Sequence, residues 1–372
     1  MLAIGGYGRG ELSPLSDIDL LFIFPKRTTE VSSFVRTVLY LLWDAGLVIG
    51  HSARSVPECL RYAREDFHNE TAMLEHRFVA GSEAVTLEFE KRYETYLLRA
   101  GKGVQLRRRL QEQGARYRLW DPSVYVQEPN IKESAGGLRD FHVILWLARS
   151  LFGVKNIEKI HRAGLSSEAE CERIQEAYDF LLRLRAQLHL QAGGKSDLLT
   201  FAAQAAAAPA LGYADEDTAT ASEKLMRDYF IRARSIQTFC RDFFEAAEER
   251  LKAGSRKKKK SRIESLGGGL ALRDYQHLIL DGDANEVLEG EAGLMRVFEC
   301  QYQFGCSLSP ELRAVVRSHL DRIDDAFRCS AGVKESFFRI LMGKAGTAQT
   351  LHEMHELGFL GRYLPEFEPL TC

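Results

Sequence analysis

Two acidic residues near the start of the chain have the spacing of paired metal ligands. Asp17 and Asp19 stand two positions apart and lead into the apolar stretch 20–24, which has strand character. Residues two apart in a strand point to the same face, so the two carboxylates should lie side by side while Ile18 and Leu20 enter the core. Hard oxygen ligands in this arrangement suit Mg²⁺. We therefore predict that Asp17 and Asp19 are catalytic and bind the metal.

A glycine-rich stretch precedes the acidic pair. Gly5, Gly6 and Gly8 can adopt backbone conformations that approach a ligand closely, and successive N–H groups of such a turn form an anion-binding concavity. Arg9 adds a planar guanidinium that matches phosphate oxygens. We predict that these four residues cradle a triphosphate. Ser16 orients the first carboxylate or contacts a phosphate, or else simply forms the turn.

These two features together indicate one reaction class. Glycine-rich phosphate binding beside paired carboxylates favours nucleotidyl transfer assisted by two metal ions. In that reaction a hydroxyl attacks the α-phosphorus of a nucleoside triphosphate, and pyrophosphate leaves. A glycine turn followed by a solvated edge strand is the plainer alternative.

A second candidate phosphate site lies at 128–140, with the sequence EPNIKESAGGLRD. Two glycines ahead of a helix leave free N–H groups at the positive end of the helix dipole. The alternative is a structural turn in which Arg139 pairs with Glu128 or Asp140, and Asn130 helps to shape either arrangement. The residues predicted to bind phosphate here are Lys132, Gly136, Gly137 and Arg139.

The motif GGYGRGELSPLSDIDLLF at 5–22 resembles the signature of the DNA polymerase β-like nucleotidyltransferase superfamily. More narrowly, it resembles the family of uridylyltransferases that modify the nitrogen-regulatory protein PII. The segment 128–140 resembles a second element of that family. A softer resemblance runs through 195–199, Gln204, 211–213 and 225–230.

The resemblance implies a fold and an activity. The expected fold class is α+β, with a small polymerase-β-like α/β domain followed by a mainly α-helical bundle. The expected reaction transfers UMP from UTP to a tyrosine hydroxyl of PII with Mg²⁺ or Mn²⁺. Family members also carry a hydrolase domain with a His-Asp signature and two sensor domains. No His-Asp dipeptide occurs in this sequence, so we expect a fragment of a longer protein.

The chain departs from the superfamily pattern at one point. A third carboxylate usually stands on the strand beside the acidic pair, but residues 50–55 contain neither Asp nor Glu. Asp66 or Glu75 supplies a third ligand, or there is none. Arg54 on this strand is predicted to contact phosphate.

Composition limits the partners and the cellular compartment that we expect for this protein. The 372 residues carry a net charge of −2, which gives no general attraction to nucleic acid or membrane. The seven cysteines are scattered without zinc-site spacing, as in reduced proteins. No apolar run reaches membrane-spanning length. We therefore expect a cytoplasmic protein with no membrane or nucleic-acid partner, while the family resemblance implies UTP and PII as its partners.

Hydrophobic periodicity, composition and the family resemblance together divide the chain into four expected regions. The resemblance implies a nucleotidyltransferase domain, then a helical uridylyltransferase-type domain. A basic and glycine-rich linker follows, and the last region is a helical extension that the resemblance places before an absent hydrolase domain. The basic run 256–262 in the linker touches RNA or an acidic partner, or is simply solvated. The four predicted regions are 1–118, 119–252, 253–269 and 270–372.

Two other functions fit the motifs. A glutamine-synthetase adenylyltransferase shares both glycine elements and the acidic pair, and would use ATP. A non-catalytic regulatory module would bind nucleotide and a partner protein without turnover. Metal-dependent turnover and the choice of nucleotide separate the three.

Overall fold

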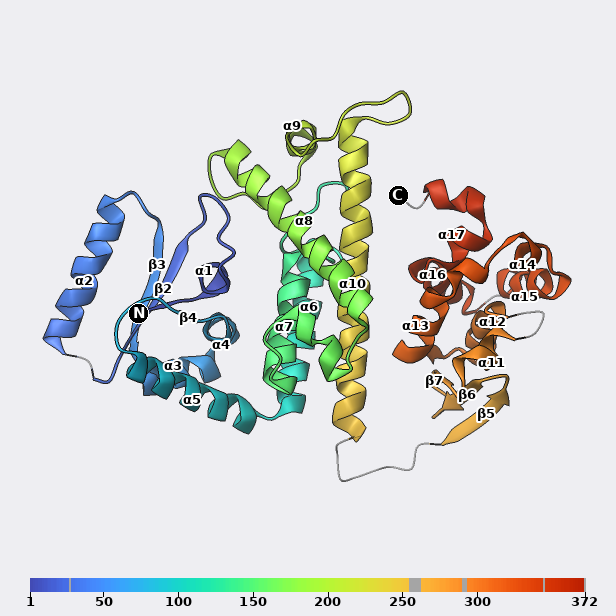
Figure 1. Ribbon diagram of the computed structural model, residues 1–372, viewed down its shortest axis with the longest axis horizontal. Coiled ribbons are helices and arrows are strands. Elements are labelled where there is room, and N and C mark those ends of the chain that lie inside the picture. The colour runs from blue at the N-terminus through green and yellow to red at the C-terminus, as the bar shows by residue number, and fades with distance from the viewer. Residues whose placement is uncertain (27, 254–261, 290–292, 344, 371–372) are drawn as a thin grey trace. The chain divides into compact units, whose positions relative to one another are not determined.

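The computed structural model describes residues 1–26, 28–253, 262–289, 293–343 and 345–370 (Figure 1). The chain divides into two compact units, Met1–Glu248 and Glu249–Cys372. Within the described ranges, no helix has both the length and the apolarity that crossing a membrane requires.

The first unit begins with a four-stranded sheet in the order β3-β2-β1-β4. Its centre is the parallel pair β2–β3, in which Asp19 stands opposite Gly50. The short β1 runs antiparallel to both β2 and β4. The strands are β1 (Leu2–Ala3), β2 (Ile18–Phe24), β3 (Ile49–Ser55) and β4 (Arg77–Phe78).

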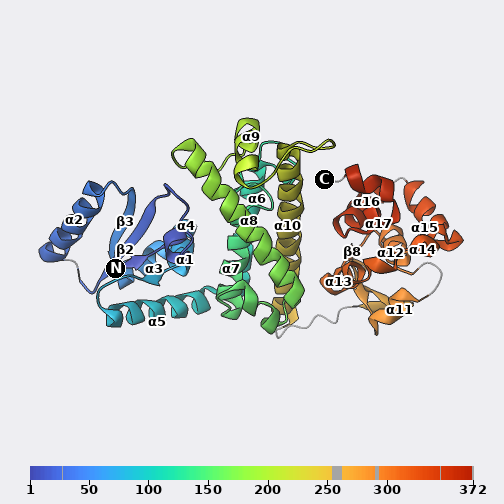
Figure 2. The same cartoon turned by 45° about the horizontal axis from the view of Figure 1, so that its top comes forward.

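Helices cover both sides of this sheet. Leu20 and Phe22 of β2 pack against Val35 and Leu39 of α2, and Ile18 lies against the same cluster. Figures 1 and 2 show α2 on one side of the strands and both α1 and α4 on the other. The five helices of this part are α1 (Gly5–Arg9), α2 (Thr29–Asp44), α3 (Val56–Glu65), α4 (Phe67–Leu74) and α5 (Glu83–Ala100).

A helical region completes the first unit. Ser167 and Glu170 form a reciprocal capping box that starts α8, and Gly193 in the left-handed conformation ends it. The helix α7 contacts both α6 and α8. The long helices are α6 (Lys102–Trp120), α7 (Leu138–Phe152), α8 (Glu168–Ala192), α9 (Phe201–Ala210) and α10 (Ala221–Ala253), with 3₁₀ turns at Ile157–Lys159 and His161–Ala163.

The second unit has its own sheet and core. Its strands are β5 (Ile263–Gly267), β6 (Leu270–Arg273), β7 (His277–Leu280) and β8 (Ser307–Leu308), in that order in the sheet. Buried side chains between Leu270 and Tyr363 form one hydrophobic cluster. The helices are α11 (Ala284–Leu288), α12 (Met295–Phe304), α13 (Pro310–Ser318), α14 (Asp325–Cys329), α15 (Ala331–Leu341), α16 (Thr347–Glu356) and α17 (Phe359–Tyr363), with 3₁₀ turns at Leu320–Arg322 and Pro365–Leu370.

The predicted α+β fold class is confirmed, with a small sheet followed by a helical region. We predicted a linker at 253–269 and a helical extension at 270–372. Both predictions are wrong in part, because β5, β6 and β7 form an antiparallel meander there. Three consecutive glycines, Gly267–Gly269, all have positive φ and turn the chain between β5 and β6. A glycine-rich stretch therefore marks a strand connection here. Of the basic run 256–262, all but Arg262 lies outside the described residues.

The proposed boundary between 1–118 and 119–252 falls inside the first unit and stays a prediction.

Candidate functional site

The side chain of Asp19 fits into a space left by two glycines. On the neighbouring strand, a Cβ added to Gly50 would lie 2.3 Å from Asp19 Oδ1. A Cβ added to Gly5 at the start of α1 would lie 3.3 Å from Asp19 Oδ2. The carboxylate therefore sits at the edge of the β2–β3 pair, on the face opposite the α2 cluster, as the alternation of side chains requires.

Asp17 lies directly before β2, and its charge affects Asp19. Burial, and then the charge of Asp17, raise the pKa of Asp19, while Lys195 and Lys132 lower it. The Nζ atom of Lys195 is 3.0 Å from Asp17 Oδ2. Two carboxylates close enough for their charges to interact supply hard oxygen atoms that suit a divalent cation such as Mg²⁺.

Among the residues that the structure describes, no third carboxylate joins this pair to form a metal-binding group. Asp66 starts α4 and accepts hydrogen bonds from the backbone N–H of His68 and the side-chain amide of Asn69. Glu75 accepts from Trp146 and is paired with Arg9, each at 2.6 Å. Across the described ranges, no group of three or more His, Cys, Asp or Glu side chains could hold a metal ion together.

Arg9 is engaged in ion pairs with other residues of the fold. Its guanidinium contacts Glu11 at 2.7 Å and Glu75 at 2.6 Å. Burial alone would lower the pKa of Arg9, but Glu75, Tyr178 and Glu11 together outweigh burial and raise it. The structure therefore places Arg9 in a buried charge network between α1 and the end of α4, and phosphate binding by Arg9 stays a prediction.

The glycines before Asp17 begin a short helix, not the open turn that their sequence suggested. Gly5 has a φ of 60° and starts α1, and Gly6 follows it. Gly8 is a glycine for a packing reason, since an added Cβ would lie 1.9 Å from the carbonyl oxygen of Glu75. Gly5 therefore lies on the Asp19 side of α1, whereas Gly8 packs against the end of α4.

Arg54 lies on β3 but at some distance from the carboxylates. It stands four residues beyond Gly50, which corresponds to about 13 Å along a strand. Its Nη1 donates to Asn69 Oδ1 at 3.0 Å, and its guanidinium lies over the ring of Tyr62. The structure does not bring Arg54 to Asp17 or Asp19.

The loop 128–140 satisfies its own backbone groups. Asn130 Oδ1 accepts from the N–H groups of Lys132 and Glu133, as expected of a residue that shapes the loop. The N–H of Gly136 donates to the Asp140 carboxylate at 2.7 Å, and that of Gly137 donates to Ser134. The expectation that these two glycines leave free N–H groups for a phosphate is therefore wrong.

Packing explains why Gly136 is a glycine. A Cβ there would lie 2.0 Å from the carbonyl oxygen of Ala233 on α10, and the φ of Gly136 is 72°. Arg139 pairs with Glu133 at 3.1 Å, which is neither of the partners that the structural alternative named. Lys132 is the member of this loop whose charge acts on Asp19, and burial, followed by Arg139, lowers its own pKa.

The segment 195–199, which carries only a soft family resemblance, brings Lys195 to the site. This segment runs beside the loop 128–140: Ile131 N–H donates to the carbonyl oxygen of Asp197, and Leu199 N–H donates to that of Pro129, both at 2.9 Å. The signal was present as KSDLL at 195–199, but a lysine between two helices has no periodicity that predicts its partner.

Ser16 belongs to the same arrangement. Its hydroxyl is 3.5 Å from Nδ1 of His189, and that nitrogen is 2.7 Å from the carbonyl oxygen of Pro14. The other ring nitrogen of His189 is 3.2 Å from Asp197 Oδ1, and Arg185 contacts the same carboxylate at 2.6 Å. The turn before Asp17 and the segment after α8 are thus held together through one buried histidine.

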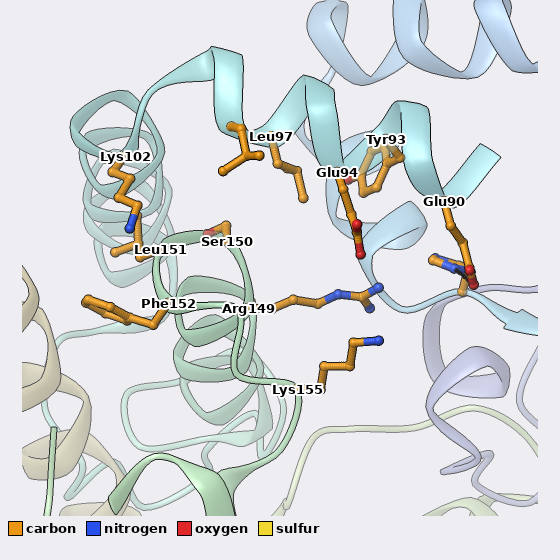
Figure 3. Close-up of a pocket in the computed structure, with 13 residues that line it drawn as sticks. Glu90, Tyr93, Glu94, Leu97, Lys102, Arg149, Ser150, Leu151, Phe152 and Lys155 are labelled. Atoms are coloured by element: carbon orange, nitrogen blue, oxygen red, sulfur yellow. Dashed lines mark hydrogen bonds and ion pairs between the residues drawn. The ribbon is translucent and has the colours of Figure 1, made fainter. Parts of the chain in front are cut away.

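A pocket of about 370 Å³ lies elsewhere in the first unit, between α5, the start of α6 and the end of α7 (Figure 3). The figure shows Arg149 and Lys155 extending side by side into it from one wall, with Glu90 and Glu94 on the other. None of its lining residues is a predicted site residue. The carboxylate pair, and not this pocket, therefore carries the candidate chemistry.

Comparison with known families agrees with a site at Asp17 and Asp19. Three family models match: a nucleotidyltransferase domain at residues 1–76, the GlnD PII-uridylyltransferase domain at 104–244, and the third domain of uridylyltransferase GlnD at 285–363. Both carboxylates fall in the first match, and the lysines fall in the second.

Curated relatives match along the whole chain. Proteins named bifunctional uridylyltransferase/uridylyl-removing enzyme are 34% identical in Ruegeria pomeroyi and in Caulobacter vibrioides, and 33% identical in Azospirillum brasilense. The alignments cover 99–100% of this chain but only 40–41% of those proteins. The chain therefore spans about two fifths of the length of the relatives that it matches.

Proposed function

We propose that this chain, which is related over its whole length to the bifunctional uridylyltransferase/uridylyl-removing enzymes, transfers UMP from UTP to a tyrosine hydroxyl of the nitrogen-regulatory protein PII. The observation that supports this proposal most directly is the carboxylate pair of Asp17 and Asp19, at the N-terminal end of β2 within the nucleotidyltransferase match. We further propose a cytoplasmic setting without a membrane or nucleic-acid partner.

In the proposed reaction, the tyrosine oxygen attacks the α-phosphorus of UTP. The bond from that phosphorus to the bridging oxygen of the β-phosphate breaks, pyrophosphate leaves, and the phenol proton passes to solvent. Asp17 and Asp19 would hold Mg²⁺ or Mn²⁺. A bound divalent cation supplies positive charge that polarises phosphoryl oxygens and favours the ionised form of an attacking hydroxyl.

The chain's own groups would position the substrate. Lys132 and Lys195 bring two positive charges to the carboxylates, where a triphosphate needs neutralisation. The N–H groups of Gly5 and Gly6 at the start of α1 would meet a phosphate oxygen beside Asp19. The buried contacts of Arg9 would keep α1 in place, and a contact of its guanidinium with phosphate stays part of the proposal.

Transfer of an α-phosphate label tests the proposal. Purified chain, purified PII and Mg²⁺ are incubated with α-labelled UTP or, in parallel, with α-labelled ATP. We expect labelled PII from UTP, and loss of labelling in Asp17→Asn and in Asp19→Asn, because each substitution removes a charged ligand. Labelling from ATP alone would instead indicate an adenylyltransferase.

Two further outcomes would contradict the proposal. Unchanged labelling in both Asp variants would show that the site is elsewhere. Nucleotide binding without transfer from either nucleotide would favour a regulatory module.

A further inference from the structure

The lysine nearest to the acidic pair comes from outside the sheet. Lys195 lies between α8 and α9, and its Nζ contacts Asp17 Oδ2 at 3.0 Å. About half of each side chain remains exposed, 50% for Lys195 and 42% for Asp17. The contact is thus an ion pair at the surface of the site, formed with a carboxylate that we assign to metal binding.

Such a pair is easily replaced. Exposed lysine–carboxylate pairs contribute little stability because water and salt screen them and because both side chains lose freedom. A divalent cation binds the same carboxylate with twice the charge of an ammonium group. It also repels that ammonium group, so the two cannot occupy the same side of Asp17 together.

The backbone around Lys195 is held much more firmly than its side chain. Two residues later, Asp197 pairs with Arg185 at 2.6 Å and with His189 at 3.2 Å, and its carbonyl oxygen accepts from Ile131. The backbone at Lys195 is therefore fixed, while its four-carbon side chain is flexible. It can change its partner without moving the segment.

We propose that Lys195 is an exchangeable counter-ion: it neutralises Asp17 until a divalent cation binds there, and then contacts a phosphate oxygen of the nucleoside triphosphate. This inference rests on the proposed function for the identity of the nucleotide. Lys132 differs from Lys195, because it is largely buried beside Glu133 and is tied to the loop 128–140.

The proposal predicts opposite changes in two affinities. In Lys195→Met, Mn²⁺ should bind the full 372-residue chain about two- to fivefold more tightly without nucleotide, since a competing cation is gone. UTP should bind about ten- to a hundredfold more weakly with Mn²⁺ present, since a charged hydrogen bond to phosphate is lost. Both affinities are measured at fixed ionic strength, by calorimetry and by the electron paramagnetic resonance signal of free Mn²⁺.

Two control variants separate this mechanism from others. Lys155→Met removes the same charge at the pocket shown in Figure 3 and should leave both affinities unchanged. Lys195→Arg keeps the charge and should keep the Mn²⁺ affinity near that of the original chain. Loss of a merely structural residue would weaken both affinities together and would lower the unfolding temperature.

Unchanged or weaker Mn²⁺ binding in Lys195→Met would overturn the proposal, and so would unchanged UTP binding. Neither measurement contains PII. If the two affinities shift as expected but no label reaches PII, the counter-ion role stands and the proposed function fails.

Discussion

At the scale of single residues, the position of the Asp19 carboxylate depends on a glycine in the neighbouring strand, which has no side chain. Asp19 Oδ1 occupies the space where Gly50 would carry a Cβ, on the strand that pairs with β2 in parallel. A methyl group 2.3 Å from that oxygen cannot be accommodated at van der Waals distance, so the carboxylate would have to turn away. The glycine in β3 therefore serves the geometry of the site, at the cost of weaker strand propensity.

Gly50→Ala should thus reduce catalysis more than it reduces stability. We expect the proposed transfer rate to fall about ten- to a hundredfold, because a reacting group displaced by about 1 Å has effects of that size. The free energy of unfolding should fall by about 1–3 kcal/mol, as in other overpacked sites. Steady-state labelling of PII and urea denaturation measure the two quantities.

Gly114→Ala is the matched control for this prediction. Gly114 lies within α6, and an added Cβ would only approach a guanidinium nitrogen of Arg118 at 3.8 Å. The transfer rate should stay unchanged there, and stability should rise slightly, since alanine favours the helix. An equal loss of activity in both variants would mean that Gly50 has no special relation to Asp19.

The sequence predicts local geometry better than it predicts which residues contact one another over long distances in the chain. Spacing alone predicts that Asp17 and Asp19 lie together, because strand alternation is a local property. Arg9 and Arg54 looked equally suited to phosphate, yet their partners Glu75 and Asn69 come from a helix that only the folded chain brings near. An arginine in a motif does not reveal whether its charge faces a ligand or a glutamate.

At the scale of elements, the stability of the segment after α8 depends on the ionised side chain of Asp197. Burial alone would raise the pKa of Asp197, but hydrogen bonds and charge from Arg185, followed by the hydrogen bond of His189, lower it. A lowered carboxyl pKa means that the ionised form is favoured in the folded state. Its stabilising effect is therefore present above the ordinary aspartate pKa of about 3.9 and is lost as the pH falls through the folded-state value.

We expect Asp197→Asn to lower the free energy of unfolding by about 2–4 kcal/mol at pH 7, because Arg185 would lose its buried partner. The difference between variant and original should shrink as the pH falls below about 4. Urea denaturation at pH 7 and at pH 3.5 measures both effects.

Asp179→Asn, at an exposed position of α8, removes the same charge and should change stability by less than about 0.5 kcal/mol. A pH-independent loss in Asp197→Asn would show that the carboxylate charge is not what stabilises the segment.

Element boundaries are predictable where a local signal marks them. The capping box at Ser167 and the glycine after α8 act through neighbouring residues, so the local sequence marks both ends of that helix. By contrast, α4 ends at Leu74, and Phe78 shortly after it pairs with Leu2 of β1. Pairing with a strand at the far end of the domain leaves no periodic trace in so short a segment.

At the scale of the whole molecule, the two units differ in what they contain. All of the sequence-predicted site residues, and Lys195, lie in Met1–Glu248. The second unit buries its own cluster between Leu270 and Tyr363, with Phe298 and Phe359 in contact at a ring distance of 4.7 Å. A unit with a separate core can fold without another, which is the usual property of a domain.

Residues 1–253, which end with the last residue of α10, should therefore fold alone and keep the site. We expect Mn²⁺ and UTP to bind this piece within about twofold of their affinities for the 372-residue chain, since distant, independent parts contribute additively. Calorimetric titration of both proteins, with circular dichroism to confirm folding, makes the comparison. Folded protein with much weaker UTP binding would mean that the second unit contributes to nucleotide binding. Full binding without labelling of PII would instead assign the second unit to the protein substrate.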